Sequence, residues 1–331
     1  MTPSEVIVPS VLEHLRTVPD GAAWLSRLPH LVARAAARWD LELGPPFEAG
    51  SVAWTALARA RGEQRWPYVV KVSYPHPEAA HEAEALLHWH HAGAPTLIDV
   101  EPQEWAMLMQ AIHPGTPLSA PQWGDDRALH AGASLLARLH DRGAPAPGFS
   151  SLVEVSRGWC DLVTERAARH TWAQVDDSLV TQMLSLVSTL TTTPSRGSVP
   201  LVPSVLLHGD ANPGNMLAGD GANGVQWFAI DPKPLVGDPA FDPPPLIEQV
   251  GAPFTAPDQG AELARRARRV GACTHAAPER IAQWGLVRAV ETTLWMAEST
   301  PAHDRDSRRA QMERAWARAH AWRRAIALLG D

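Results

Sequence analysis

The stretch from residue 205 to 242 constrains the fold of this chain most. It contains short apolar runs that predict strands, and Asp and Asn residues follow these runs at fixed positions. Val205 to Leu207 and Gln226 to Ile230 are brief apolar or β-favouring runs cut off by polar turn residues, and each predicts a buried strand. Met216 begins a further run, and the turn residues at 219–224 predict that it folds back as a hairpin. The residues that follow the run at 226–230 are therefore expected to lie near the residues that follow the run at 205–207.

Three oxygen-bearing side chains occupy those positions. Asp210 follows the first run, Asn215 lies five residues later, and Asp231 ends the last run. Oxygen donors of this kind suit Mg²⁺, which is usually held by one or two carboxylates together with substrate phosphates. The alternative is a loop in which Asp and Asn only satisfy turns. The Asn spacing and the second strand favour a metal-bound phosphate beside a general base.

Two motifs in this stretch carry a family resemblance. Residues 208–215, HGDANPGN, and residues 230–242, IDPKPLVGDPAFD, resemble the aminoglycoside phosphotransferase family. Many small-molecule kinases share the first motif, whereas the second resembles more narrowly the streptomycin 6-phosphotransferase and hydroxyurea-resistance kinase branch. The resemblance implies a two-lobed protein-kinase-like fold of the α+β class.

Lysine usage points to a second part of the site. Of 29 basic residues only Lys71 and Lys233 are lysines, and an ammonium that reaches a phosphate is not freely replaced by a guanidinium. Lys71 lies in an otherwise apolar strand, so its charge needs a partner. Glu82 and Glu84 follow in a helix, and the resemblance of HEAEALLHW to the family pattern favours Glu82. Such a pair positions the α- and β-phosphates in protein-kinase-like folds.

The first third of the chain is rich in predicted strands. Apolar residues at helical spacing predict a leading helix over 22–41, which Gly44-Pro45-Pro46 would stop. The runs at 52–59, 68–73, 96–99 and 105–110 are expected to complete a five-stranded antiparallel lobe. Residues 48–51 between helix and strand predict either a nucleotide-covering turn or a plain hairpin turn. We expect residues 1–110 to form an N-terminal lobe that also holds a helix near 77–92.

The rest of the chain has helical periodicity. Helices are predicted over 127–140, 152–169, 179–190, 261–270, 279–298 and 304–329, with a loop over 191–203. Residues 111–331 should therefore form a larger helical lobe that holds the catalytic loop 208–215 and the metal segment 230–242. Two lobes of this kind predict a cleft in which ligands bind. The resemblance places Met109 at the back of the adenine pocket, with the Gln110 carbonyl and the Ile112 amide bonded to adenine.

These features predict an ATP-dependent kinase of a small molecule. Asp210 would accept the acceptor's proton, and Asn215 and Asp231 would hold Mg²⁺. Further candidates on the acceptor side are Asp238, Asp242 and Lys233, and Lys233 has the alternative of pairing structurally with Asp238 or Asp242.

The acceptor itself stays open at this point. The resemblance implies a streptomycin-type aminoglycoside. A kinase of an amino alcohol, a sugar or hydroxyurea and a nucleotide-binding protein without transfer activity are the alternatives. The phosphorylated position and the choice between ATP and GTP are not fixed by these motifs.

Composition excludes some other classes. The chain has 331 residues, 45% of them hydrophobic, which suffices for one large or two modest domains. Its net charge of −7 gives no reason to expect nucleic acid as a partner. Membrane-spanning apolar runs and signal-peptide features are not evident, so a cytoplasmic location is the default expectation. An obligate protein partner is not indicated either.

Overall fold

The chain divides into two compact units. The computed structural model describes residues 5–192, 204–221 and 224–330. Unit 1 comprises residues 1–116 and 217–233, and unit 2 comprises residues 117–216 and 234–331. Residues 217–233 thus group with the N-terminal part, whereas they were predicted in the C-terminal lobe.

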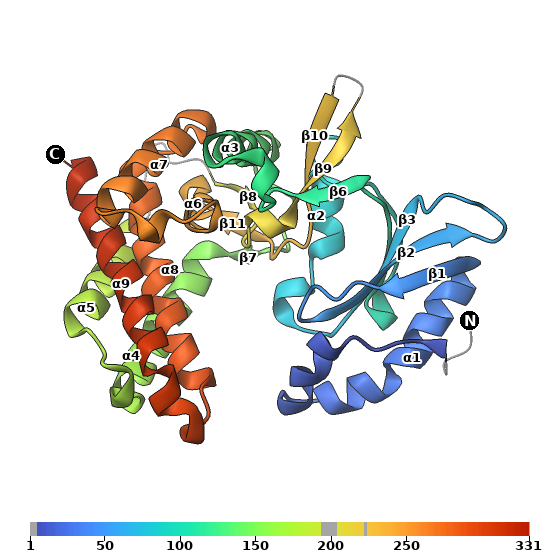
Figure 1. Cartoon of the computed structure of the whole chain (residues 1–331), viewed down its shortest axis with the longest axis horizontal. Helices are drawn as coiled ribbons and strands as arrows, with labels where there is room; N and C mark the ends of the chain where they lie inside the picture. Colours follow the sequence, from blue (N-terminus) through green and yellow to red (C-terminus); the bar gives the residue numbers. More distant parts are fainter. Residues whose placement is uncertain (1–4, 193–203, 222–223, 331) are drawn as a thin grey trace. The chain divides into compact units, whose positions relative to one another are not determined.

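Unit 1 is built on a five-stranded sheet in which neighbouring strands run antiparallel, in the order β1-β2-β3-β5-β4. Figure 1 labels β1, β2 and β3 of this sheet. Its strands are β1 (Leu41–Pro46), β2 (Ala53–Ala60), β3 (Tyr68–Ser73), β4 (Leu97–Glu101) and β5 (Ala106–Gln110). The sequence placed four of them, but β1 was wrongly assigned to the end of the leading helix and its stop. A strand at the sheet edge tolerates Pro45 and Pro46 because it needs few ladder donors there.

Helix α1 (Gly21–Arg38) supplies the apolar layer on one face of this sheet. It ends at Arg38, three residues before the predicted end. Leu28 and Val32 of α1 and Val70 and Val72 of β3 are fully buried in one cluster. Successive strand residues point to opposite faces, so Lys71 between those valines points away from α1. Helix α2 (Glu82–His88) is the other α-helix of this unit's described residues.

A smaller sheet of unit 1 has the order β10-β9-β6. Its strands are β6 (Pro114–Pro117), β9 (Met216–Gly221) and β10 (Gly224–Ala229). The predicted hairpin is therefore confirmed, although part of its expected turn, residues 222–223, lies outside the described residues. Strand β10 ends directly before Ile230 and Asp231.

Unit 2 is mainly helical. Its α-helices are α3 (Asp125–His140), α4 (Leu152–Arg169), α5 (Asp177–Leu190), α6 (Pro243–Gln249), α7 (Gln259–Thr274), α8 (Pro278–Ser299) and α9 (Arg305–Gly330). Six of these were predicted, whereas α6 was missed because it begins with three prolines. Proline is tolerated in the first helical turn, where its missing N–H would have no partner anyway. Most of the expected loop at 191–203 lies outside the described residues.

Side-chain caps fix where several of these helices begin. Ser151 accepts a hydrogen bond from the Val153 amide at the start of α4, and Asp176 accepts from two amides at the start of α5. Asp258 accepts from the Ala261 amide before α7. These caps satisfy amides that have no partner inside the helix.

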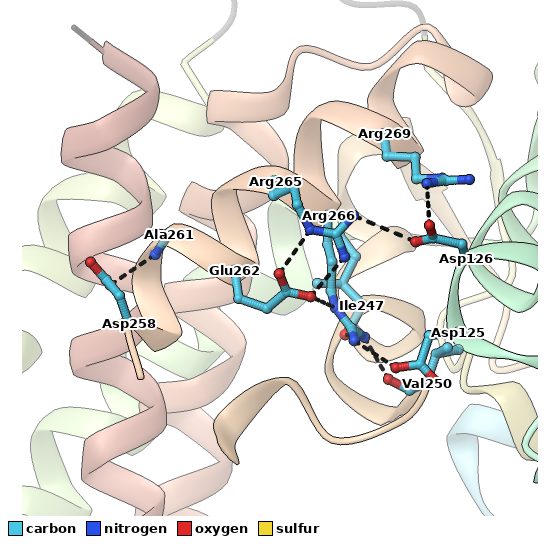
Figure 2. A network of polar contacts seen from close by, with 10 residues as sticks. All are labelled: Asp125, Asp126, Ile247, Val250, Asp258, Ala261, Glu262, Arg265, Arg266 and Arg269. Carbon is cyan, nitrogen blue, oxygen red and sulfur yellow. Dashed lines mark hydrogen bonds and ion pairs between the residues drawn. The ribbon is translucent and has the colours of Figure 1, made fainter. Parts of the chain in front are cut away.

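Arg266 of α7 ties three helices of unit 2 together (Figure 2). The guanidinium is buried and donates to the carbonyls of Ile247 and Val250 at the end of α6, at 3.2 and 2.5 Å. It also binds Glu262 within α7 at 2.6 Å and Asp125 of α3 at 3.1 Å. Helix ends leave carbonyls without intrahelical partners, and Arg266 supplies donors for two of them.

A short three-stranded sheet in unit 2 has the order β7-β11-β8. Its strands are β7 (Ser150–Ser151), β8 (Val205–Leu207) and β11 (Leu235–Gly237). Strand β11 pairs antiparallel with β8, with Leu235 opposite Leu207 and Gly237 opposite Val205. This pairing brings the chain after β11 to the loop that follows β8. Among the described residues, no helix is long and apolar enough to cross a membrane.

Candidate active site

Unit 1 gathers one buried ammonium and two carboxylates. Lys71 Nζ lies 2.6 and 2.7 Å from the two carboxylate oxygens of Glu82, and 2.5 Å from Oδ1 of Asp231. Lys71 and Glu82 are buried, whereas the Asp231 side chain is 42% exposed. The partner of Lys71 on α2 is thus Glu82, the carboxylate favoured over Glu84 from the sequence. The arrangement presents a fixed cation beside a carboxylate that solvent or a ligand can reach.

The charges of this cluster shift one another's proton affinities. Burial alone would lower the pKa of Lys71, but the carboxylates of Glu82 and Asp231 outweigh it and hold that pKa above its ordinary value. Burial raises the pKa of Glu82, while Lys71 opposes the shift and Asp231 adds to it. Lys71 is therefore protonated at any neutral pH and acts as a permanent point charge.

Asp231 reaches Lys71 from a left-handed backbone conformation. Its φ is 55°, which Asp tolerates better than most residues. Two residues on, Lys233 Nζ lies 3.5 Å from Glu78 Oε2, and the Lys233 side chain is 42% exposed. Glu78 is a different partner from Asp238 and Asp242, the two carboxylates with which the sequence suggested that Lys233 could pair.

In unit 2, the loop after β8 is fixed by the buried carboxylate of Asp242. This side chain has no exposed surface and accepts hydrogen bonds from the amides of His208 and Gly209, each at 2.8 Å. His140 Nε2 of α3 donates to it at 2.8 Å. Burial would raise the pKa of Asp242, but the His140 hydrogen bond and the neighbouring charges and amides hold it below its ordinary value. Asp242 therefore acts as an ionised anchor for residues 208–209.

Asp210 is half-buried at the end of this loop and is oriented by two asparagines. Asn212 Nδ2 donates to Asp210 Oδ1 at 3.1 Å, while its own Oδ1 accepts from the amides of Gly214 and Asn215. Asn215 Nδ2 donates to the Asp210 carbonyl at 3.0 Å. With its nitrogen used in this way, Asn215 presents its side-chain oxygen as the remaining polar atom. The Asp210 amide donates to Nδ1 of the buried His208 at 3.3 Å, so His208 contacts the loop backbone.

Comparison with known proteins decides the family. The chain matches the family of aminoglycoside/hydroxyurea antibiotic resistance kinases over residues 42–300. The chain belongs to this family. The kinase is 30% identical over 284 residues to streptomycin 6-kinase of Streptomyces griseus, which covers 84% of the kinase and 86% of that protein. It is 31% identical over 298 residues to hydroxyurea phosphotransferase of Kitasatospora aureofaciens, which covers 88% and 81%.

Solved structures give the same fold. The kinase is similar to a choline/ethanolamine kinase family protein from Mesorhizobium loti with a TM-score of 0.62 and 16% identity, over 90% of the kinase and 99% of that chain. The α+β protein-kinase-like fold expected from the sequence is thereby confirmed. The family consists of kinases, so this protein is a phosphotransferase that uses a nucleotide and a small-molecule acceptor with a hydroxyl group.

Two carboxylates expected to face the acceptor are engaged inside unit 2 of the kinase. Asp242 anchors the loop, as described above. Asp238 accepts from Arg280 Nε at 2.7 Å and from Trp284 Nε1 at 2.8 Å, and it caps a short 3-10 helix through the Ala240 amide. Only 8% of the Asp238 side chain is exposed. Both carboxylates are thus bonded to donors of the protein itself, and their assignment to the acceptor stays a prediction.

The residues expected to contact adenine lie where β5 ends. Met109 is buried in β5 opposite Val69, Gln110 is the exposed last residue of that strand, and Ile112 is half-buried after it. The Gln110 amide donates to the Thr96 carbonyl at 2.9 Å. Their assignment to adenine stays a prediction.

Sequence reasoning missed three side chains that support the loop, Asn212, His140 and Arg288. Asn212 carried a local signal, because an Asn before Pro-Gly is typical of a cap on a short helix. His140 and Arg288 lie in helices, where nothing in the periodicity separates them from other helical residues. Arg288 donates to the Gly209 carbonyl.

Proposed function

We propose that the kinase transfers the γ-phosphate of ATP to a hydroxyl of a streptomycin-type aminoglycoside, with Asp210 as the general base. The observation that carries the proposal is the geometry of the 208–215 loop. The Asp242 carboxylate accepts hydrogen bonds from two backbone amides of this loop, and Asn212 donates to one oxygen of the Asp210 carboxylate. A general base needs a fixed direction toward the proton that it accepts. The similarity to streptomycin 6-kinase supports the acceptor class.

The chemistry assigned to Asp210 is a single proton transfer. The acceptor hydroxyl gives its proton to the Asp210 carboxylate while its oxygen bonds to the γ-phosphorus. The bond from that phosphorus to the bridging oxygen breaks, and ADP leaves. Positioning and charge stabilisation supply most of the rate enhancement in such reactions.

Lys71 is assigned to the phosphates of the nucleotide. Glu82 holds it by both carboxylate oxygens, so the ammonium has little freedom and its charge is retained near neutral pH. The fixed charge can therefore bind phosphate oxygens without a large ordering cost. Lys233 is assigned to the ion pair with Glu78.

The donor set fits Mg²⁺. The side chains assigned to it are Asn215, whose amide presents oxygen, and Asp231, whose carboxylate is 42% exposed. Within the described residues there is no group of three or more His, Cys, Asp or Glu that could hold a metal ion. Mg²⁺ is usually held by one or two protein oxygens together with nucleotide phosphates, and a bound ion would neutralise phosphate charge.

An acceptor screen tests the proposal. Purified kinase with Mg-ATP is offered streptomycin, other aminoglycosides, amino alcohols, sugars and hydroxyurea, and products are identified by mass spectrometry. We expect streptomycin to gain one phosphoryl group. Phosphorylation of hydroxyurea alone would favour the second candidate, which the hydroxyurea phosphotransferase relative supports. Tight Mg-ATP binding without any product would contradict transfer activity.

A variant tests the base. Asp210→Asn should lower kcat by about 10²- to 10⁴-fold while nucleotide affinity stays within about twofold. Asp306→Asn on the exposed start of α9 is the matched control, and it should leave both quantities unchanged. Unchanged turnover in Asp210→Asn would contradict the base assignment.

A further inference from the structure

Arg288 of α8 reaches the carbonyl directly before Asp210. Its two terminal nitrogens Nη1 and Nη2 lie 3.2 and 3.3 Å from the Gly209 oxygen. That carbonyl and the Asp210 amide belong to one planar peptide unit. The amide side of the same plane donates to His208 Nδ1. Arg288 and His208 therefore hold the two sides of the peptide plane from which the Asp210 side chain projects.

The guanidinium also lies on an aromatic ring that precedes the loop anchor. The Arg288 Cζ atom is 4.4 Å from the centroid of the Phe241 ring, and Phe241 is the residue before Asp242. Phe241 is 1% exposed and packs edge-to-face on Trp284, with centroids 5.3 Å apart. A cation over a desolvated ring is held more strongly than one at an exposed site. The position of Arg288 is thus set by packing as well as by hydrogen bonds.

Four carboxylates face this cation. Burial lowers the pKa of Arg288, and the charges of Asp210, Asp242, Glu248 and Glu291 oppose that shift, with Asp210 the largest of them. Arg288 is half-buried, and an apolar residue of similar volume is often as stable as a charge that has been taken partly out of water. Packing alone therefore does not account for an arginine here. The hydrogen bonds from Arg288 to the Gly209 carbonyl, directly before Asp210, give a reason for an arginine at this position.

We propose that Arg288 is a positioning residue that sets the direction of the Asp210 carboxylate through the Gly209 carbonyl. The inference rests on the proposed role of Asp210 as the base. Gly209 has φ of +78°, so its conformation is one that side chains disfavour and that the loop must hold by other contacts. Asp242 supplies the contact at its amide and Arg288 supplies the contact at its carbonyl.

The first test separates positioning from substrate binding. Arg288→Gln removes the charge and should lower kcat by about 10- to 100-fold, with KM for ATP and for the acceptor unchanged, because a small misplacement of a catalytic group costs that much. Arg288→Lys keeps a cation and should retain more of kcat, and it carries the test if Arg288→Gln does not fold. A rise in KM for the acceptor with kcat preserved would overturn the proposal, because Arg288 would then contact that ligand.

Arg266→Gln is the matched control. Arg266 is likewise a guanidinium that donates to backbone carbonyls and faces carboxylates, but it is buried where Arg288 is half-buried, and its carbonyls belong to Ile247 and Val250 (Figure 2). Its loss should lower stability and leave kcat per folded molecule within about twofold of the parent. An equal fall of kcat in both variants would overturn the proposal, since the loss of any arginine that binds backbone carbonyls would then suffice.

A double variant tests whether Arg288 acts through Asp210. In the Asp210→Asn background, Arg288→Gln should lower the residual rate by less than about twofold, because interacting groups show non-additive effects. Full additivity would overturn the proposal. These comparisons need an active parent enzyme. A parent that transfers no phosphate to any acceptor contradicts the proposed function instead.

Hydrogen exchange gives a readout that does not depend on activity. The amides of His208 and Gly209 should exchange faster in Arg288→Gln than in Arg266→Gln, as measured by mass spectrometry of a peptide that covers residues 204–212. Equal exchange in the two variants would overturn the positioning role even if the parent kinase were inactive.

Discussion

Replacing Asp242 should be among the most costly single changes in unit 2. Its carboxylate is fully buried and accepts three hydrogen bonds of 2.8 Å, from His208 N, Gly209 N and His140 Nε2. Asp242→Asn keeps the shape but has only one acceptor oxygen, and its amide nitrogen would face a donor. At least one of the three donors then loses its hydrogen-bond partner, and the other donors bond to a neutral acceptor instead of a charged one.

The magnitude follows from those contacts. A buried donor without a partner costs about 1–3 kcal/mol, and bonds to a charged group are worth about 1.5–3 kcal/mol each. We therefore expect Asp242→Asn to lower the free energy of unfolding by about 3–5 kcal/mol. Urea denaturation followed by circular dichroism measures it, with Asp306→Asn as the exposed control. A loss below about 1 kcal/mol would refute this account of the loop.

The effect should depend on pH in a defined direction. The pKa of Asp242 is lower in the folded protein than in an unfolded chain, where Asp titrates near about 3.9. The unfolded state therefore binds the proton more readily, and the carboxylate stabilises the fold fully above the unfolded pKa. This contribution is lost as pH falls through the folded pKa. The difference in stability between parent and Asp242→Asn should thus be constant near neutral pH and narrow in acid.

Three further predictions concern other contacts. Lys71→Met should weaken nucleotide binding in a titration. It should also lower the free energy of unfolding in urea by about 3 kcal/mol, because Glu82 stays buried without its cation. Unchanged nucleotide affinity and unchanged stability would contradict both roles of Lys71. Asp231→Ala should abolish the Mg²⁺ dependence of nucleotide binding in calorimetry, and retention of that dependence would exclude it as a ligand. Gly285→Ala should destabilise by about 1–3 kcal/mol despite the better helix propensity of Ala, because its Cβ would lie 2.6 Å from the Trp322 ring; a gain in stability would contradict the close packing of α8 on α9.

The loop 208–215 and the segment 230–242 could be assigned from the sequence because their signals are local. Turn residues, short apolar runs and a fixed Asp-to-Asn spacing are all readable along the chain. The same holds for α4, whose predicted bounds agree with the structure because a full apolar face marks its length. Lys71 was recognised because an ammonium in an apolar strand needs a partner.

Local signals failed where neighbours in space overrode them. Strand β1 contains Gly and two prolines and resembles a helix stop, yet it pairs with β2 at the edge of the sheet. Helix α6 begins with three prolines, which a pattern search takes as a break. Only packing in the folded chain shows that both are regular elements.

The sequence by itself determined the kinase-like order of strands and helices, the base Asp210 as a candidate, and Lys71 with its partner on the next helix. Only the tertiary structure decided how the 208–215 loop is held. Asp242 bonds to the His208 amide across 34 residues, Arg288 reaches Gly209 across 79, and His140 meets Asp242 across 102. No periodicity within one element encodes such contacts, because they depend on which surfaces of distant elements become neighbours when the core forms.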